Sequence, residues 1–350
     1  MFQISLRLTT LGSCSSSSSS IVFPLGKIFD RFLGKRLQSS LPASNYDYIL
    51  DRSESNRLRN EIFDDEKKRQ SQLIPRVEKI QVNVTNVKPY EDATLIMNKH
   101  LSTPYHCAQH FSQLITERSI IAAIDGKHLW DMHRPLTNDC NLQFRHFKDE
   151  DPTEVNRAFW RSCSFLLGMI VQRAFKSDIP VYLHSWPKPS IKSGCFIYDV
   201  QLPTLHDWKP DKEEIRSLTG MFWKLNASTK GHFERLDVKP SVAKEIFKDN
   251  KFKSQQVDDI EKEIGSEGKI SLYRLSDHID FSVGPMIPDP SHIGRVSVAC
   301  VHKLDSDIEN LYRFQGVATP SKLPIHFYPY RILLDRASKP RTNMIPQSRN

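Results

Sequence analysis

Two histidines in the first half of the chain have a spacing that can bind a metal ion. His106 and His110 lie four residues apart, with Cys107 between them, in a segment (105–116) that we expect to be helical. Residues four apart share one face of a helix, so both imidazoles could reach the same ion. A zinc site needs a third and a fourth ligand, and the neighbouring sequence supplies none at a recognisable spacing. We therefore interpret the pair as surface histidines and predict no metal there.

The other cysteines and histidines do not form a recognisable site. The six cysteines contain no C-x-x-C pair, which argues against a zinc ribbon and against a disulfide framework. Cys163, His278 and His292 could in principle build a relocated site, but Cys163 lies on the apolar face of a predicted helix, where a buried thiol is expected. The sequence contains no P-loop, which excludes a P-loop GTPase, and no G-x-G-x-x-G or G-x-S-x-G pattern.

The strongest local pattern is a long helix predicted over residues 151–176. Asp151 can cap it, Pro152 suits its first turn, and Glu154 resembles the acidic member of a capping box. Apolar residues recur at steps of three and four, so one face is expected to be buried. They are Phe159, Cys163, Leu166, Leu167, Ile170, Val171 and Ala174.

This helix resembles the one that opens the editing domain of threonyl- and alanyl-tRNA synthetases. The similarity rests on residues 161–168, Arg-Ser-Cys-Ser-Phe-Leu-Leu-Gly. In that family two histidines four residues apart stand on the helix, and a later phrase, Asp-x-Cys-x-Gly-Pro-His, supplies two more ligands. Asp280, Gly284 and Pro285 match the later phrase here. Residues 193–200 and 311–318 resemble two further strands of the same domain.

All four ligand positions of that family hold other residues in this chain. Arg161 and Phe165 stand where the two histidines are expected, and Ser282 and Met286 replace the Cys and the His. A guanidinium stays protonated and a phenyl ring has no donor atom. A thioether suits Cu(I) rather than zinc-activated water, and a lone serine needs a base. The resemblance therefore implies a retained scaffold with no catalytic residue, no metal and no cofactor.

The region before this helix, residues 76–149, has the pattern of a small β-grasp fold. Ile80, Val82 and Val84 alternate as in a strand, a helix is expected at 105–116, and further strands are expected at 120–124 and 142–147. This order resembles the TGS domain of threonyl-tRNA synthetases. The expected fold class is α+β: a TGS-like domain followed by a larger α+β domain over residues 150–320, which resembles the editing domain. Helices are expected within the larger domain at 211–226, 241–250 and 254–264.

Most of the positive charge lies near the two ends of the chain. The formal charge is +8, from 49 basic and 41 acidic residues. Residues 1–45 carry five basic residues against one acid, and residues 335–350 carry four against one. The body is nearly neutral, so any RNA contact must use a local patch or a terminal segment. We expect a basic tail at 321–350 that is disordered in the free protein from Arg336 to Arg349, and its candidate RNA or partner contacts are Arg336, Lys339, Arg341 and Arg349.

The N-terminal 45 residues resemble a mitochondrial transit peptide. They are rich in serine and contain one acid, and residues 25–37 form a predicted amphipathic helix with Lys27, Arg31 and Lys35 on one face. A charged helical extension follows at 46–75. Its apolar stripe is thin, so we expect it to lie against the body or a partner.

The combination resembles one family closely, the mitochondrial large-subunit ribosomal proteins that carry the number thirty-nine. Residues 97–99, 102–105, 158–163 and 313–317 all resemble that family. The resemblance implies a structural, non-catalytic protein of the mitochondrial matrix, which contacts ribosomal RNA and neighbouring ribosomal proteins. No apolar run is long enough to span a membrane. The alternative is a freestanding tRNA-binding or trans-editing module derived from threonyl-tRNA synthetase, which co-sedimentation with the large subunit would distinguish.

Overall fold

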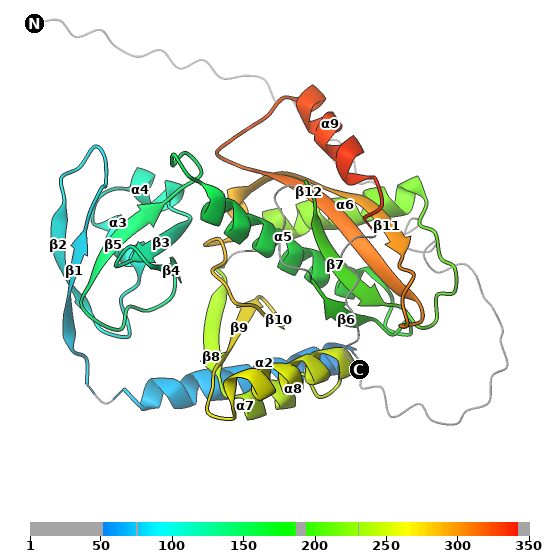
Figure 1. Cartoon of the computed structure of the whole chain (residues 1–350), viewed down its shortest axis with the longest axis horizontal. Coiled ribbons are helices and arrows are strands. Elements are labelled where there is room, and N and C mark those ends of the chain that lie inside the picture. The colour runs from blue at the N-terminus through cyan, green and yellow to red at the C-terminus, as the bar shows by residue number, and fades with distance from the viewer. Residues whose placement is uncertain (1–51, 75, 187–193, 230, 342–350) are drawn as a thin grey trace, which may run out of the picture. The chain divides into compact units, whose positions relative to one another are not determined.

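The computed structural model describes residues 52–74, 76–186, 194–229 and 231–341. These residues form a mixed α+β fold with three sheets, which confirms the predicted fold class at that level (Figure 1). The predicted amphipathic helix at 25–37 lies outside the described residues. Within the described part of the chain, no helix is both long and apolar enough to cross a membrane.

The first sheet lies early in the chain and has the strand order β2-β1-β5-β3-β4. Its strands are β1 (Lys79–Val84), β2 (Ala93–Asn98), β3 (Ile121–Ile124), β4 (His128–Asp131) and β5 (Cys140–Arg145). β1 and β5 are parallel, and the other neighbours are antiparallel. Alternate residues of these strands, such as Val82 and Leu142, form a small core of their own.

Two short helices accompany this sheet where the sequence predicted one. α3 (Pro104–Gln109) and α4 (Gln113–Arg118) replace the helix expected at 105–116. The break has a local cause, because the Ser112 hydroxyl accepts a hydrogen bond from the Ile115 amide and starts a new helix. Thr103 caps α3 in the same way.

α5 (Thr153–Ala174) is the long helix that the sequence predicted, but its start and its burial differ from the prediction. Pro152 occupies the N-cap and Asp151 accepts a hydrogen bond from the Thr153 amide at 3.1 Å, while Glu154 pairs with Arg157 instead of completing a capping box. Every residue from 161 to 172 is buried. The helix is therefore enclosed on all sides, and not on one face alone.

The second sheet packs against α5 and has the order β11-β12-β7-β6, with all neighbours antiparallel. The strands are β6 (Tyr182–Ser185), β7 (Phe196–Gln201), β11 (Ile293–Lys303) and β12 (Leu311–Pro320). α6 (Lys212–Ser228) packs on β11, and a short 3-10 turn, η2 (Pro290–His292), leads into that strand.

The third sheet, in the order β10-β9-β8, is covered by three helices. The strands are β8 (Glu234–Val238), β9 (Ile270–Leu275) and β10 (His278–Phe281), and the helices are α2 (Arg52–Gln72), α7 (Pro240–Ile246) and α8 (Lys251–Ile264). Figure 1 shows α2, α7 and α8 side by side under this sheet. Phe63 of α2 is fully buried there, and Asn60 donates to the Asp277 carbonyl at 2.8 Å. The charged extension is thus helical and packs on the body.

The C-terminal segment is more ordered than the sequence suggested. α9 (Phe327–Ala337) packs on β12, and the chain after it returns to the same strand. The buried Gln315 side chain donates to the carbonyls of Ala337 and Lys339 and accepts from the Arg341 amide at 2.7 Å. The expectation of disorder from Arg336 to Arg349 is therefore wrong for residues 336–341, because Gln315 bonds to the backbones of Ala337, Lys339 and Arg341. The last nine residues lie outside the described part.

Candidate functional site

Arg161 occupies the interior beside α5 as a buried cation. Its side chain is 8% exposed, and its guanidinium donates to the Pro285 carbonyl at 2.7 Å. Burial lowers the pKa of Arg161 from its ordinary value, and a guanidinium stays protonated in proteins. A guanidinium fixed in this way joins α5 to the loop after β10, and it has no lone pair to offer a metal ion.

Phe165 lies one helical turn after Arg161 and fills the core with an aromatic ring. It is fully buried, with ring centroids 5.4 Å from Phe233 and 4.8 Å from His278 in edge-on contacts. Such contacts are favourable packing arrangements for aromatic rings. The position is therefore occupied by packing, with no atom that could ligate or transfer a proton.

The loop after β10 carries the other two positions, Ser282 and Met286. Met286 is 1% exposed, its sulfur lies 3.5 Å from the Ser162 hydroxyl, and its amide donates to Asp131 at 2.7 Å. The Ser282 hydroxyl accepts from the Gly284 amide at 3.3 Å, which stabilises the turn of the loop. Two side chains of α5, Arg161 and Ser162, thus contact the loop at Pro285 and Met286. The Ser282 hydroxyl instead bonds within the turn of the loop.

Gly284 is required by the shape of this loop. Its φ is +64°, and a Cβ there would lie 1.9 Å from the Tyr273 hydroxyl. Gly168 on α5 has a related role, since a Cβ would lie 2.5 Å from the ring of Tyr198 on β7. These two glycines let backbone and aromatic rings approach closely, a role that needs no catalytic chemistry.

A buried network around Asp131 connects β4 to the third sheet. The Tyr273 hydroxyl lies 2.9 Å from the Asp131 carboxylate, and the Arg235 guanidinium lies 3.3 Å from it. Burial, followed by the charge of Asp131, raises the pKa of Tyr273, so the phenol stays protonated and donates. Sequence analysis missed this network, because Asp131 is 104 residues from Arg235 and 142 from Tyr273, and the three belong to no motif.

Asp280, which matches the editing-domain phrase, forms a second buried network. It accepts from the Lys253 ammonium at 2.7 Å and from the Tyr198 hydroxyl at 2.5 Å. Burial lowers the pKa of Lys253 and raises that of Tyr198. All three side chains are essentially inaccessible to solvent. The carboxylate therefore serves to neutralise and orient buried donors from α8 and β7.

Asp199 and Arg313 form a third buried pair, between β7 and β12. Two guanidinium nitrogens contact the two carboxylate oxygens at 2.7 and 2.8 Å, and both residues are fully buried. Arg313 also donates to the Arg341 carbonyl at 2.8 Å. Burial raises the pKa of Asp199, against the opposing effect of Arg313. Asp199 and Arg313, which lie in stretches that resemble the editing domain, thus join β7 to β12.

The histidines considered for a relocated site have structural partners. His278 is buried, its Nδ1 lies 2.9 Å from the Gln172 amide oxygen, and burial lowers its pKa to about 4. His292 contacts the carbonyls of Asp289 and Glu117. Cys163 is fully buried, which raises the pKa of its thiol. Among the described residues no group of three His, Cys, Asp or Glu side chains has a metal-binding arrangement.

The two histidines with the spacing of metal ligands are His106 on α3 and His110 at its C-cap, and both line a surface hollow. Both side chains are exposed, and His106 Nδ1 lies 3.2 Å from the Thr103 amide as part of the cap of α3. His106 thus already has a local structural partner.

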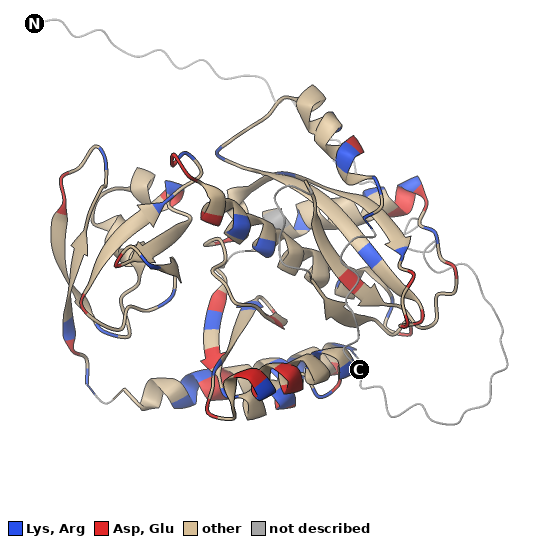
Figure 2. Cartoon of the chain, viewed as in Figure 1, with Lys and Arg blue, Asp and Glu red and all other residues tan. Residues whose placement is uncertain are grey.

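The candidate C-terminal contacts fall in two groups. Arg336 lies in the last turn of α9, while the backbones of Lys339 and Arg341 are held by Gln315. Arg349 lies outside the described residues. Figure 2 shows basic and acidic residues interspersed along α2, α7 and α8, in agreement with the nearly neutral body inferred from composition.

Comparison with known proteins decides the family. No protein-family model matches the chain. The large ribosomal subunit protein mL39 of Drosophila melanogaster is 43% identical over 290 residues, which cover 82% of this chain and 85% of that protein. The chain belongs to the mL39 family. The predicted resemblance to this family is thereby confirmed.

Threonine–tRNA ligases form a second, more distant group of relatives. The probable cytoplasmic threonine–tRNA ligase 1 of Dictyostelium discoideum is 28% identical over 236 residues, 66% of this chain and 30% of that enzyme. The bovine cytoplasmic enzyme is 30% identical over 226 residues, 63% of this chain and 28% of that enzyme. The chain therefore spans less than a third of these ligases. This agrees with the predicted relationship between the mL39 family and threonyl-tRNA synthetases.

Proposed function

We propose that this chain is a structural, non-catalytic component of the mitochondrial large ribosomal subunit. It resides in the mitochondrial matrix and binds the ribosomal RNA of the subunit and neighbouring ribosomal proteins. The observation that carries the proposal is the 43% identity to the mL39 protein, which extends over 82% of one chain and 85% of the other. Similarity over nearly the full length of both proteins favours one shared role.

The absence of catalysis is supported by the chemistry of the four positions discussed above. Arg161 and Phe165 offer no metal ligand, and the Met286 sulfur is buried beside a serine hydroxyl. The residues that match the editing-domain phrases contribute buried ion pairs and close packing instead.

The domain assignment is part of the proposal. Residues 76–149 form a TGS-like domain, and residues 150–320 form an editing-like domain whose ligand residues are lost. Residues 1–45 are a transit peptide, residues 46–75 are the helical extension, and residues 321–350 are the basic C-terminal segment. The relationship to threonine–tRNA ligases supports a common origin for both domains.

Sedimentation of tagged full-length protein from a mitochondrial lysate tests the function. We expect the protein to sediment with the large subunit in a sucrose gradient. A protein that stays at the top of the gradient with bound tRNA would favour the alternative, a freestanding tRNA-binding or trans-editing module. Hydrolysis of mischarged threonine tRNA by the purified protein would overturn the non-catalytic part.

The same gradients test the C-terminal segment. A variant with Lys339→Gln and Arg349→Gln is expected to leave the subunit at lower potassium chloride than wild type, because each lost phosphate contact reduces the salt slope by about 0.7–0.9.

Import into mitochondria tests the N-terminal segment. A fusion of residues 1–50 with Lys27, Arg31 and Lys35 changed to Glu is expected to stay outside mitochondria. Normal import of that fusion would contradict the transit-peptide assignment.

A further inference from the structure

β2 is the edge strand of the first sheet, and no other strand among the described residues pairs with its outer side. The Lys99 amide donates to the Glu78 carbonyl at 2.9 Å. Hydrogen-bonded and non-hydrogen-bonded pairs alternate along an antiparallel ladder. In the observed register Thr94 and Ile96 therefore belong to non-hydrogen-bonded pairs, and their amides and carbonyls point away from β1. Figure 1 shows β2 at the margin of the sheet.

Two neighbouring contacts agree with this orientation. On β1, the amide of Gln81, which stands opposite Ile96, donates to Asp139 at 2.8 Å on the side away from β2. On β2, the Asn98 amide donates to the Ser102 hydroxyl at 3.0 Å, so the chain itself covers that end of the edge. The open window is therefore residues 94–96.

This edge lacks the devices by which isolated proteins protect exposed strands. Lysine, proline, a bulge or a covering loop normally blocks pairing with another chain. The strand Ala-Thr-Leu-Ile-Met-Asn contains neither lysine nor proline, and its register with β1 is regular over all six residues. The side chain of Ile96 is also 64% exposed. An unprotected apolar edge is typical of a strand that another segment covers in the assembled state.

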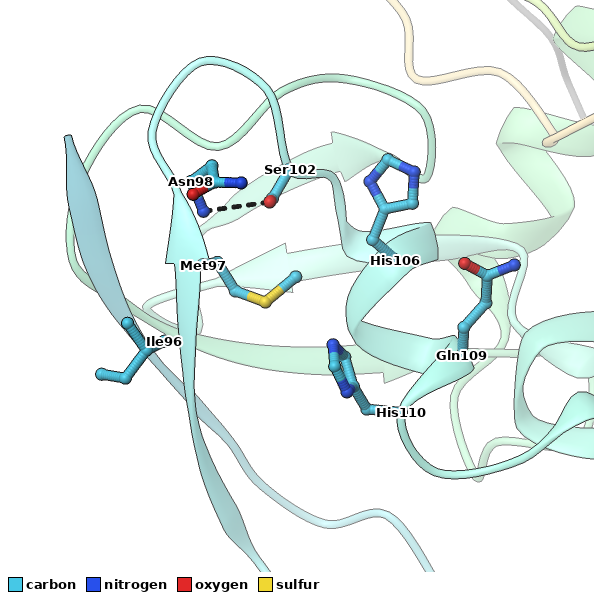
Figure 3. Close-up of a pocket in the computed structure, with 7 residues that line it drawn as sticks. All are labelled: Ile96, Met97, Asn98, Ser102, His106, Gln109 and His110. Atoms are coloured by element: carbon cyan, nitrogen blue, oxygen red, sulfur yellow. Dashed lines mark hydrogen bonds between the residues drawn. The ribbon is translucent and has the colours of Figure 1, made fainter. Parts of the chain in front are cut away.

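A surface hollow of about 420 Å³ lies beside this edge, between β2 and α3. His106 and His110 project from α3 into it, beside Met97 and Asn98 of β2 (Figure 3). Ser102, Gln109 and Ile96 complete the lining. A strand edge with a helix beside it forms a groove in which an added strand gains backbone hydrogen bonds and places alternate side chains in pockets.

The charges around the hollow indicate the kind of side chain that it takes. Its lining contains two histidines and three other polar side chains but no Asp or Glu. At its rim the Lys79 ammonium donates to the Asn98 side chain at 2.6 Å. Lys99, next along the chain, pairs with Glu78 at 3.0 Å. Hydrogen-bond donors of the lining, close to the Lys79 ammonium, favour a carboxylate as the group that enters the hollow.

We propose that an extended, acidic segment of a neighbouring ribosomal protein adds to β2 as a sixth strand. Its backbone pairs with Thr94 and Ile96, and one of its carboxylates enters the hollow between β2 and α3. The inference rests on the proposed function, because the partner is a neighbour in the large subunit. It adds to that function a surface, a mode of binding and the chemistry of the partner.

The test uses full-length protein with the photoreactive residue p-benzoylphenylalanine at position 109, assembled into large subunits and irradiated. We expect an adduct with an acidic segment of another protein. Ile96→Pro removes the outward amide without affecting the pairing of β1, and should lower the adduct yield about tenfold. Ile96→Thr keeps that amide and a β-branched side chain, and should stay within about twofold of wild type.

A second variant covers the case in which Ile96→Pro does not fold. His110→Glu places a negative charge in the hollow at an exposed position and should also lower the adduct yield. An adduct with ribosomal RNA or with a second copy of this chain would overturn the proposal, as would unchanged yields in the folded variants. Wild-type protein that does not enter large subunits would instead contradict the proposed function, so the two failures are distinguishable.

Discussion

Residues that match the editing-domain phrases each support the packing of a neighbour. Gly168 makes room for the Tyr198 ring, and Asp280 receives hydrogen bonds from Tyr198 and Lys253. Asp199 pairs with Arg313 in the second sheet. The same residue types can therefore persist after ligand chemistry is lost, because the fold depends on them. This predicts that substitutions at these positions change stability.

Gly284→Ala is expected to destabilise the protein by about 2 kcal/mol or more, because the new Cβ meets the Tyr273 hydroxyl and the positive φ is strained. Urea unfolding of the full chain measures this. The matched control is Gly220→Ala within α6, where a Cβ would meet nothing within 4 Å. That change should stabilise the protein by about 0.5–1 kcal/mol. Equal effects of the two substitutions would contradict the geometry of the loop.

Lys253→Met is expected to cost about 3–5 kcal/mol, because it leaves the Asp280 carboxylate buried without a counter-ion. The matched control is Lys262→Met on the same helix, whose exposed partner is Asp259. The control should change stability by less than about 1 kcal/mol. The denaturant midpoints of the two variants measure both changes in stability. A Lys253 variant as stable as the control would show that the Lys253–Asp280 pair contributes little.

At the scale of elements, one buried side chain makes three hydrogen bonds to the end of α9 and the segment after it. Gln315 lies on β12, is fully buried, and bonds to the backbones of Ala337, Lys339 and Arg341. Backbone groups at the end of a helix need such partners when they approach a sheet. The C-terminal segment is thereby joined to the second sheet.

Gln315→Leu is expected to release this segment and to expose the bonds after Arg336, Lys339 and Arg341 to trypsin. The loss of three hydrogen bonds should raise the rate of cleavage there about tenfold or more. Mass spectrometry of limited digests measures the rate. Gln113→Leu, at an exposed position on α4, is the control and should leave the rate unchanged. Cleavage at the wild-type rate in the Gln315 variant would contradict the assigned role.

At the scale of the whole molecule, buried and half-buried histidines make the stability of the fold depend on pH. His133, His184 and His278 each have a pKa lowered to about 4, chiefly by burial. Such histidines are neutral in the folded state at neutral pH. The unfolded chain binds their protons at higher pH, so the stability of the protein depends on pH through them.

We expect the free energy of unfolding to decrease as pH falls from about 6.5 to about 4, because the unfolded state then binds more protons. Each histidine contributes a slope of about 1.4 kcal/mol per pH unit within that window. His278→Gln should remove one such contribution, so its stability falls less steeply than that of wild type. Urea unfolding at several pH values measures both slopes. Parallel slopes would contradict the prediction.

Sequence patterns determined those features that depend on near neighbours and on residue identity. Three- and four-residue periodicity predicted α5, helical patterns predicted α6 and α7, and a charged stretch predicted α8. Asp125-Gly126 predicted the end of β3, where both residues have positive φ. The four proposed ligand positions rest on the residue types alone and stay a prediction. The family resemblance also followed from short phrases, and the 43% identity confirms it.

Only the tertiary structure decided how distant segments pair. Strand pairing leaves no periodic signal at short range. It decided the length of β11, the position of β2 at the edge of its sheet, and the hydrogen bonds from Gln315 on β12 to the C-terminal segment. The partners Asp131 and Met286 are 155 residues apart. Periodicity reports which residues share a face within a few turns, whereas burial of a charge depends on which remote group arrives to neutralise it.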